Sequence, residues 1–326
     1  METRAVAEPA APDIRITAYV FERIFGRPPG SVRHAPGALT LLSSGPGPQG
    51  PGPGERSLTV AVPWGAIVAV GEGPLDLYSM NHHADRHTEG EPPAWAVPAL
   101  RALEAHDVPA AQMVVNRELP AQTGLLQGAE TFCAVSQALQ DINGHQAPSP
   151  PSVPDGDPAY LTGLRARSGH ALLLRGDHGV EQIPCDLAGE GLRFLIIETG
   201  ANEEPPEARC HPLLVETAAA ALRGRDLEAF GALLDRGHAR GEPSLDRALD
   251  TAREAGALGG MVVGRCAVAL VPVTAVRRVR KNVKAGLAGS TRRPPRFLTT
   301  VPAGRADHGH ADHEEGSAAE PVRASV

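Results

Sequence analysis

Proline and glycine are concentrated in two runs of this chain, and no regular helix or strand can continue through either of them. Nine of the ten residues from Gly45 to Gly54 are glycine or proline, and five prolines fall within Pro148–Pro158. Proline lacks the backbone donor that helices and sheets need, and glycine loses the most conformational freedom when a segment becomes ordered. Both runs therefore predict loops or linkers between the ordered parts of the chain.

The core between these runs has to be built mainly from alanine, valine and leucine, because aromatic residues make up only 3% of the chain. A hydrophobic content of 42% excludes a disordered chain. A length of 326 residues predicts two domains, and we place their boundary at the end of the second run. We expect a flexible N-terminus over 1–13, a domain over 14–158 that ends in the Pro-rich linker, a second domain over 159–303, and a disordered tail rich in histidine and acidic residues over 304–326.

The charge balance and the cysteines limit the partners and the compartment. The chain has 31 basic and 38 acidic residues, a net charge of −7. Binders of nucleic acid and of membrane surfaces present basic faces, so we expect neither kind of partner. The four cysteines form no CxxC pair and are expected to be reduced thiols. The sequence has no signal-peptide pattern and no run of about 18 apolar residues, so we expect a cytoplasmic protein without a membrane segment.

Hydrophobic periodicity predicts the regular elements. Apolar residues at helical spacing predict helices over 14–27, 92–105, 131–142, 213–222, 226–238, 244–255 and 275–287. Runs of small and β-branched apolar residues predict strands over 57–70, 75–79, 112–115, 169–174, 192–199 and 266–273. Because Pro63 and Gly65 interrupt the first of these runs, it predicts two strands that turn at that point.

Four stretches, in the same order along the chain, carry a family pattern. They are His34–Leu42 (HAPGALTLL), Leu119–Ala129 (LPAQTGLLQGA), Gly169–Arg193 with its GHALLL and IPCDLAGEGLR segments, and Ala257–Gly264 (ALGGMVVG). The chain thereby resembles galactokinases, members of the GHMP kinase superfamily, over about residues 14–302. The resemblance implies an α+β, two-domain GHMP-kinase-like fold with a ferredoxin-like C-terminal domain and a cleft between the domains. We expect the helices of the N-terminal domain to lie on one face of its strands.

The first motif holds the sugar in the family. Pro36 and Gly37 match the motif and are the remnant of a substrate site that the resemblance implies. Ala38, however, stands where the family has an arginine, and the Gly45–Gly54 run replaces the acidic residues and histidine that orient the sugar.

The second motif is the family's phosphate loop. Five residues match it and are candidate nucleotide-binding positions: Pro120, Gly124, Leu125, Gly128 and Ala129. Small residues and a helix N-terminus are what such a loop needs to bind an anion. Four changes oppose binding, because Gln122 replaces a glycine, Leu126 and Gln127 replace serines, and Gly128 replaces the serine that ligates Mg²⁺ in the family.

The catalytic aspartate of the family lies ten residues before the glycine of the GHALL segment. That position is Ala159 here, and Asp157 would serve as the catalytic residue only if the register shifts by two. A turn-forming role for Asp157, between Gly156 and Pro158, is the alternative that we expect. The fourth motif is shortened as well, since Val262–Arg265 replaces the family's glycine-rich turn.

These losses predict a galactokinase-like protein that has lost phosphoryl transfer and binds a sugar-like small molecule or a protein partner. Phosphoryl transfer depends on positioning and on stabilisation by a metal and charged groups, and the changes fall at four separate places. We therefore expect no cofactor. The alternative is an active ATP-dependent sugar 1-kinase, in which ATP and Mg²⁺ would be bound and Asp157 would be the base.

Two clusters of histidine and acidic residues lie outside the family motifs. His82, His83, Asp85 and His87 could ligate Zn²⁺ or Ni²⁺, or they could form an exposed polar loop. The second cluster, within 307–313, could chelate a metal weakly or belong to a solvated tail. We expect no metal site.

Eight basic residues with no acidic residue among them fall within 277–296. Such a run could be a docking face for an acidic partner, RNA or phosphate, or the solvated face of the last helix. We expect the solvated face.

Overall fold

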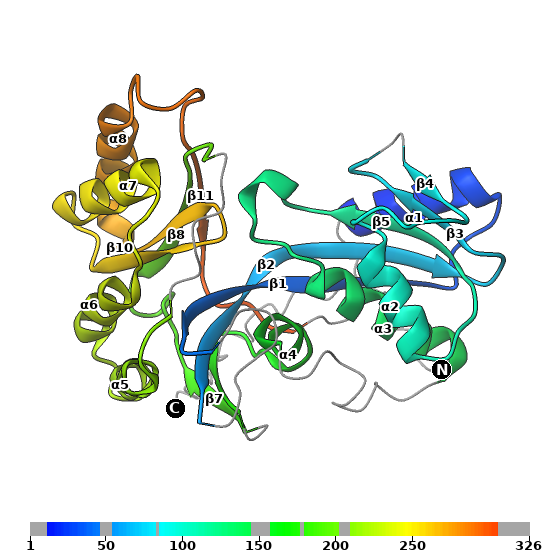
Figure 1. Cartoon of the computed structure of the whole chain (residues 1–326), viewed down its shortest axis with the longest axis horizontal. Helices are drawn as coiled ribbons and strands as arrows, with labels where there is room; N and C mark the ends of the chain where they lie inside the picture. The colour runs from blue at the N-terminus through cyan, green and yellow to red at the C-terminus, as the bar shows by residue number, and fades with distance from the viewer. Residues whose placement is uncertain are drawn as a thin grey trace, which may run out of the picture.

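Two β-sheets organise the chain in the computed structural model, which describes residues 12–45, 54–82, 85–144, 157–176, 179–201 and 209–305 (Figure 1). The predicted N-terminal segment and tail lie almost entirely outside the described residues, as do most of the two Pro-rich runs. Within the described part of the chain, no helix combines the length and apolar character needed to cross a bilayer.

The first sheet has seven strands in the order β4-β3-β5-β2-β6-β7, with β1 paired to β2. Only β3 and β5 are parallel neighbours. The strands are β1 (Ser31–Ser43), β2 (Arg56–Gly71), β3 (Asp76–Ser79), β4 (Arg86–His87), β5 (Gln112–Arg117), β6 (His170–Arg175) and β7 (Val180–Pro184). The long strand β2 pairs with β5 over one half and with β6 over the other, so it is the central strand of this sheet.

The prediction of two strands within 57–70 is wrong, because β2 runs unbroken through Pro63 and Gly65. Its pairing with β1 jumps from Gly65 opposite Pro36 to Val62 opposite Gly37, so two residues bulge out of the ladder. A bulge accommodates a proline, which cannot donate to the ladder, without ending the strand. A Cβ atom on Gly65 would lie 1.8 Å from the Ala35 carbonyl oxygen, so only glycine fits there.

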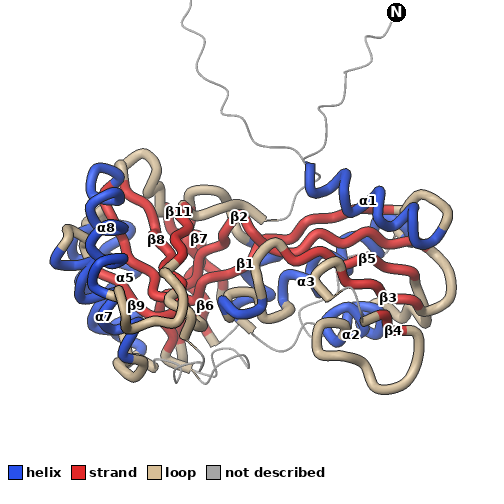
Figure 2. The backbone as a smooth tube through the Cα atoms, turned by 90° about the horizontal axis from the view of Figure 1, so that it is seen from above, coloured by secondary structure: helices blue, strands red, loops and turns tan. Residues whose placement is uncertain are grey.

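Helices cover both faces of the first sheet (Figure 2). Phe21 of α1 (Pro12–Phe25) packs on Ala69 and Val114. Ala69 belongs to β2 and Val114 to β5. The neighbouring residues of both strands point to the other face of the sheet, where they pack with α2 (Val97–Ala105), α3 (Ala129–Asn143) and α4 (Pro158–Arg165). The expectation of helices on one face is therefore correct for α2 to α4 and wrong for α1.

The second sheet has four antiparallel strands in the order β11-β8-β10-β9. They are β8 (Leu192–Glu198), β9 (Gly259–Val263), β10 (Cys266–Pro272) and β11 (Arg296–Thr300). Helices α5 (Pro212–Arg223), α6 (Leu227–Gly237) and α7 (Pro243–Glu254) connect β8 to β9, and α8 (Val276–Gly286) connects β10 to β11. This strand and helix order is the split βαβ arrangement of ferredoxin-like domains, as the resemblance implied.

The two sheets share one large apolar core. Phe194 and Val268 of the second sheet pack with α5, α6 and the strands β1, β2 and β6, whereas Leu195 and Ala269 point to the opposite face, toward α7 and α8. Strands β6 and β7, which follow the second Pro-rich run, extend the first sheet. The change of sheet thus falls between β7 and β8, whereas the predicted domain division at residue 158 falls earlier in the chain.

Candidate functional site

The loop that resembles a phosphate loop, Leu119–Ala129, leads from β5 through the short helix η2 (Ala121–Thr123) to the start of α3. Two of its backbone donors bond to carbonyl groups of the loop itself. The Thr123 amide donates to the Pro120 carbonyl at 3.1 Å, and the Gly124 amide donates to the Ala121 carbonyl at 3.2 Å. Leu125 and Leu126 are 5% and 4% exposed and belong to the shared core. The loop is therefore tightly folded and anchored by apolar side chains.

The N-terminus of α3 already has a negative charge beside it. The Glu130 carboxylate accepts from the Gly128 amide at 3.0 Å and pairs with Arg117 at 3.1 Å. The Glu130 side chain is buried, with 3% exposed, and the Arg117 side chain is partly buried, with 13% exposed. A helix N-terminus attracts anions through its free amides and its dipole. Here the Glu130 carboxylate is the anion that lies at this helix N-terminus.

Gly128 leaves no room for a side chain at the position where the family has its Mg²⁺-binding serine. Its φ is +114°, and a Cβ atom would lie 2.5 Å from Cγ of Pro98 in α2. A hydroxyl that could hold a metal ion is thus absent from Gly128 and does not fit there. Gly128 and Glu130 are thus the two residues of this region that do not fit ATP and Mg²⁺ bound as the resemblance implies.

The turn between β9 and β10 covers the phosphate-loop remnant from the other side. The Arg265 amide donates to the Thr123 carbonyl at 2.9 Å. A Cβ atom on Gly264, whose φ is +56°, would lie 2.6 Å from the Gly124 carbonyl oxygen. The shortened fourth motif therefore closes directly onto the second motif, and Gly264 is required for that close approach.

The first motif also reaches this loop. Pro36 and Gly37 lie in the middle of β1, beside the β2 bulge. A Cβ atom on Gly37 would lie 2.6 Å from Cδ2 of Leu126 and 2.8 Å from the Trp64 carbonyl oxygen. The structure thus brings together the predicted remnants of the sugar motif and of the phosphate loop.

Asp157 is the N-cap of α4, and its Oδ1 atom accepts from the Ala159 amide at 2.8 Å. Pro158 occupies the first turn of that helix, where a proline is well tolerated. Burial, with a contribution from the Asp157 charge, raises the pKa of Tyr160 to about 12. Asp157 thus caps a helix, whereas a turn was predicted, and Ala159, at the position that matches the family's catalytic aspartate, presents only a methyl group.

A histidine and a carboxylate that were not among the sequence candidates meet next to the bulge. The Nε2 atom of His34 lies 2.8 Å from Glu118, which also accepts from the Gly65 amide at 2.7 Å. Burial raises the pKa of the Glu118 carboxyl, but the bonds from His34 and Gly65 outweigh it, and the net pKa is lowered. The only sequence signal was an acidic residue directly before Leu119, and its partners lie far away along the chain.

The two clusters of histidine and acidic residues that were candidate metal sites lie partly outside the described residues. His82 is exposed, whereas His87 lies buried in β4. Among the described residues, no group of three or more histidine, cysteine, aspartate or glutamate side chains could hold a metal ion. His83 and the cluster within 307–313 lie outside the described residues.

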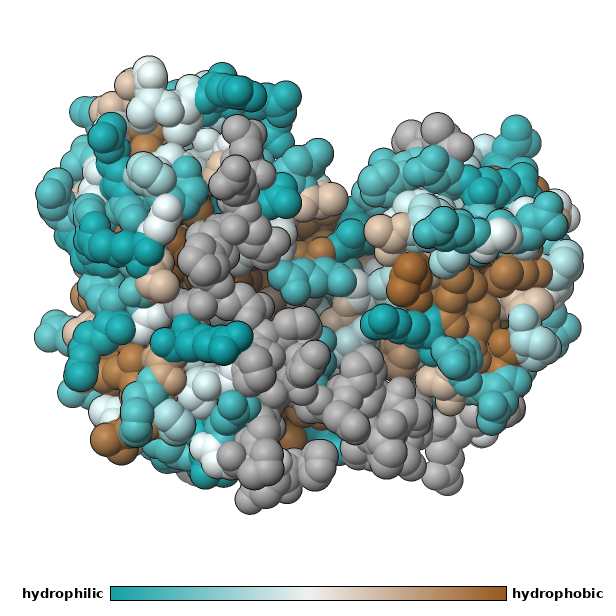
Figure 3. All heavy atoms as spheres, viewed as in Figure 1, coloured by the Kyte–Doolittle hydropathy of each residue, from teal (hydrophilic) through white to brown (hydrophobic). Residues whose placement is uncertain are grey.

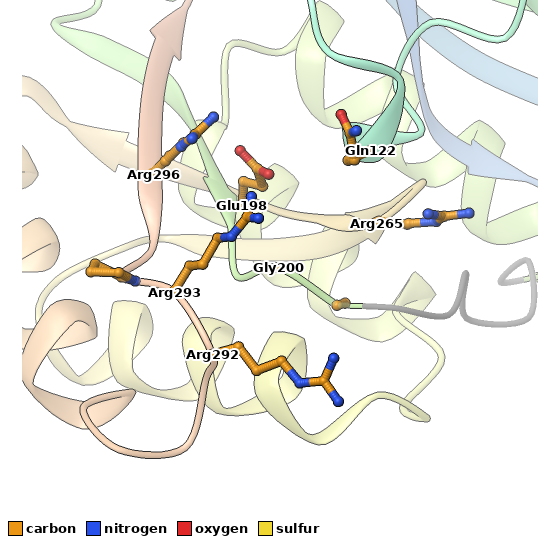
Figure 4. A pocket seen from close by; sticks show the side chains of 9 residues that line it. Gln122, Glu198, Gly200, Arg265, Arg292, Arg293 and Arg296 are labelled. Carbon is orange, nitrogen blue, oxygen red and sulfur yellow. The ribbon is translucent and has the colours of Figure 1, made fainter.

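A cavity of about 300 Å³ lies where the phosphate-loop remnant faces the second sheet (Figure 4). Gln122 contributes from the loop, Glu198 from the end of β8 and Arg265 from the β9–β10 turn, and further arginines come from the segment before β11. Figure 3 shows the surface hollowed between the two halves of the molecule. Part of the basic run within 277–296 therefore lines a cavity, which its sequence did not indicate.

Comparisons with known proteins agree with this architecture. No family model matches the chain. The galactokinase of Streptomyces coelicolor is 26% identical over 87% of this chain and 95% of its own length. A galactokinase of Streptomyces lividans is 29% identical over 42% of this chain and 50% of its own length.

Solved structures show the same fold. The galactokinase of Lactococcus lactis in complex with galactose superposes with a TM-score of 0.75, at 17% identity, over 89% of this chain and 98% of that one. The homoserine kinase of Cytophaga hutchinsonii superposes with a TM-score of 0.61, at 15% identity, over 85% and 96% of the two chains. The two sheets and their helices thus form the GHMP kinase fold that these two structures share. In sequence, the chain is similar to galactokinases over most of its length.

Proposed function

We propose that this protein has lost phosphoryl transfer and binds a sugar-like small molecule or a protein partner in the cleft of the galactokinase fold. The observation that carries the proposal is the buried Glu130 carboxylate, which accepts from the Gly128 amide and pairs with Arg117 at the start of α3. A nucleotide phosphate placed at this helix would meet a negative charge where the family needs a positive environment.

Opening the helix N-terminus for a phosphate would be costly. The Glu130 carboxylate would have to leave Arg117, and separating a buried ion pair costs about 3–5 kcal/mol. Binding energy spent on this rearrangement is no longer available for positioning the phosphoryl group and its metal, which is most of what such an enzyme does. The clash of any Gly128 side chain with Pro98 adds a second obstacle at the position of the metal ligand.

The alternative, an active ATP-dependent sugar 1-kinase with Asp157 as base, requires further rearrangements. Asp157 would have to release the Ala159 amide, and losing an N-cap bond costs about 1 kcal/mol. Ala159 itself offers no proton acceptor. We therefore place this activity second.

The cysteines support a reducing compartment. All four lie within the described residues as free thiols, and Cys133, Cys185 and Cys266 are buried. Disulfides form mainly in oxidising compartments. We propose the cytoplasm as the place where the protein acts.

One experiment separates the two functions. The purified protein is given ATP, Mg²⁺ and a panel of hexoses, and ADP release is followed for hours beside thermal unfolding with each hexose alone. We expect no ADP above the enzyme-free control and a raised melting temperature with at least one sugar, since a ligand at 100 times its Kd adds about 2.7 kcal/mol of stability. Sugar-dependent turnover that Asp157→Ala abolishes would overturn the proposal. If no sugar stabilises the protein, the partner-binding form of the proposal is the one that remains.

A further inference from the structure

Four arginines line the cavity between the phosphate-loop remnant and the second sheet. Arg292, Arg293 and Arg296 come from the end of the α8–β11 connection and the start of β11, and Arg265 comes from the β9–β10 turn. In Figure 4, Arg293 and Arg296 extend on either side of Glu198, and Arg265 and Gln122 belong to the opposite wall. Segments far apart in the sequence thus place guanidinium groups around one hollow.

These arginines have no partner in the part of the chain that the structure describes. None of the four side chains forms an ion pair or donates a hydrogen bond there, whereas Arg117, Arg175 and Arg253 each pair with a carboxylate. The Nε atom of Arg265 is buried without a hydrogen-bond partner. A buried donor without an acceptor is costly and is normally satisfied by protein, water or ligand.

The charge in the cavity is opposite to that of the whole chain. Four arginines and one glutamate, Glu198, give a local charge of +3, whereas the whole chain has −7. Glu198 and Arg296 are cross-strand neighbours on β8 and β11, so they share one face of the sheet. Among the described lining residues, one carboxylate faces four guanidinium groups, so positive charge is in excess there.

The size and shape of the cavity limit what that ligand can be. Small-molecule pockets range from about 300 to 1,000 Å³, so a cavity of about 300 Å³ admits only a small ligand. A guanidinium group offers a rigid fork of donors that matches phosphate oxygens in pairs. A nucleic acid or an acidic protein would need an extended basic face rather than this hollow.

We propose that this cavity binds a small molecule with two linked phosphoryl groups, held by Arg265, Arg292, Arg293 and Arg296. The linked groups supply a compact charge of the sign and size that the four guanidinium groups require. The site makes no use of the Gly128 amide or the start of α3. It therefore does not depend on phosphoryl transfer.

The test is a calorimetric titration of the full chain with inorganic pyrophosphate and with orthophosphate, at constant ionic strength set by chloride. Pyrophosphate is expected to bind more tightly than orthophosphate. The double variant Arg292→Gln/Arg293→Gln should weaken pyrophosphate binding at least tenfold, because a hydrogen bond to a charged group contributes about 1.5–3 kcal/mol and about 1.4 kcal/mol corresponds to a factor of ten. Both residues are exposed, so the variant should fold normally.

The matched control is Lys281→Gln/Lys284→Gln, which removes the same charge from exposed positions of α8 outside the cavity. The Kd of the control for pyrophosphate should lie within a factor of about two of the Kd of the unmodified protein, because surface charges that are not in contact with the ligand are screened by salt. Equal losses in the two variants, or no pyrophosphate binding at all, would overturn the proposal. Turnover of ATP with a hexose would contradict the proposed function but not this site, so the two failures are distinguishable.

Discussion

Replacing Glu130 with alanine is predicted to destabilise the protein strongly. Glu130 is 3% exposed, and its carboxylate accepts from the Gly128 amide and from Nε of Arg117. The variant leaves the guanidinium group of Arg117, which is 13% exposed, without its counter-charge. Removing one partner of a buried pair costs about 3–5 kcal/mol, and we expect a loss of that size in the free energy of unfolding.

The loss can be measured by urea unfolding, with tryptophan fluorescence as the signal. Trp95 is 8% exposed and Trp64 is partly buried, so unfolding changes the surroundings of both. The free energy is obtained by linear extrapolation to zero urea. The matched control is Glu228→Ala, which removes an exposed acidic residue from the first turn of α6 and should change stability by about 0.5 kcal/mol or less.

A double-mutant cycle then separates the charge from the side-chain volume. Arg117→Met with Glu130→Gln removes both charges, and the pair should lose less stability than the sum of the two single variants. If Glu130→Ala loses less than about 1 kcal/mol, as an exposed ion pair would, the reasoning about a closed helix N-terminus is refuted.

Three further predictions concern Gly128, Glu118 and Asp157. Gly128→Ser should lose about 1–3 kcal/mol from overpacking against Pro98, with more from its positive φ, and Pro98→Ala should recover part of it in the same urea assay. Glu118 has a lowered pKa in the folded state, so its contribution to stability is present above the ordinary value of 4.5 and is lost as the pH falls through the folded value. Melting curves of Glu118→Gln should accordingly change less between neutral and acid pH than those of the unmodified protein. Asp157→Ala should lose about 1 kcal/mol through the cap of α4, and Asp157→Asn much less, since asparagine caps equally well.

Elements with strong local signals were predicted closely from the sequence. The apolar periodicity over 131–142 corresponds to α3 at Ala129–Asn143, and the run over 266–273 corresponds to β10 at Cys266–Pro272. Helix α4 was missed because Pro158 looked like a breaker, although it occupies the first turn, where a missing donor has no cost. Local sequence cannot tell a proline that ends a helix from one that begins it.

Features that depend on distant residues could not be predicted. The unbroken β2 depends on its ladder with β1, and the sheet to which β6 belongs depends on pairing with β2. The role of Glu130 depends on Arg117, thirteen residues earlier and on another element. The sequence indicates which positions differ from the family motifs that it resembles, but the contacts at those positions became visible only in three dimensions.

The most direct test of the account is ³¹P NMR of the protein incubated with Mg²⁺-ATP and galactose. The account predicts that the amount of ATP falls no faster than in the enzyme-free sample and that no sugar phosphate signal appears. A growing sugar 1-phosphate signal, lost when Asp157 is replaced by alanine, would contradict the claim that the closed α3 N-terminus prevents phosphoryl transfer.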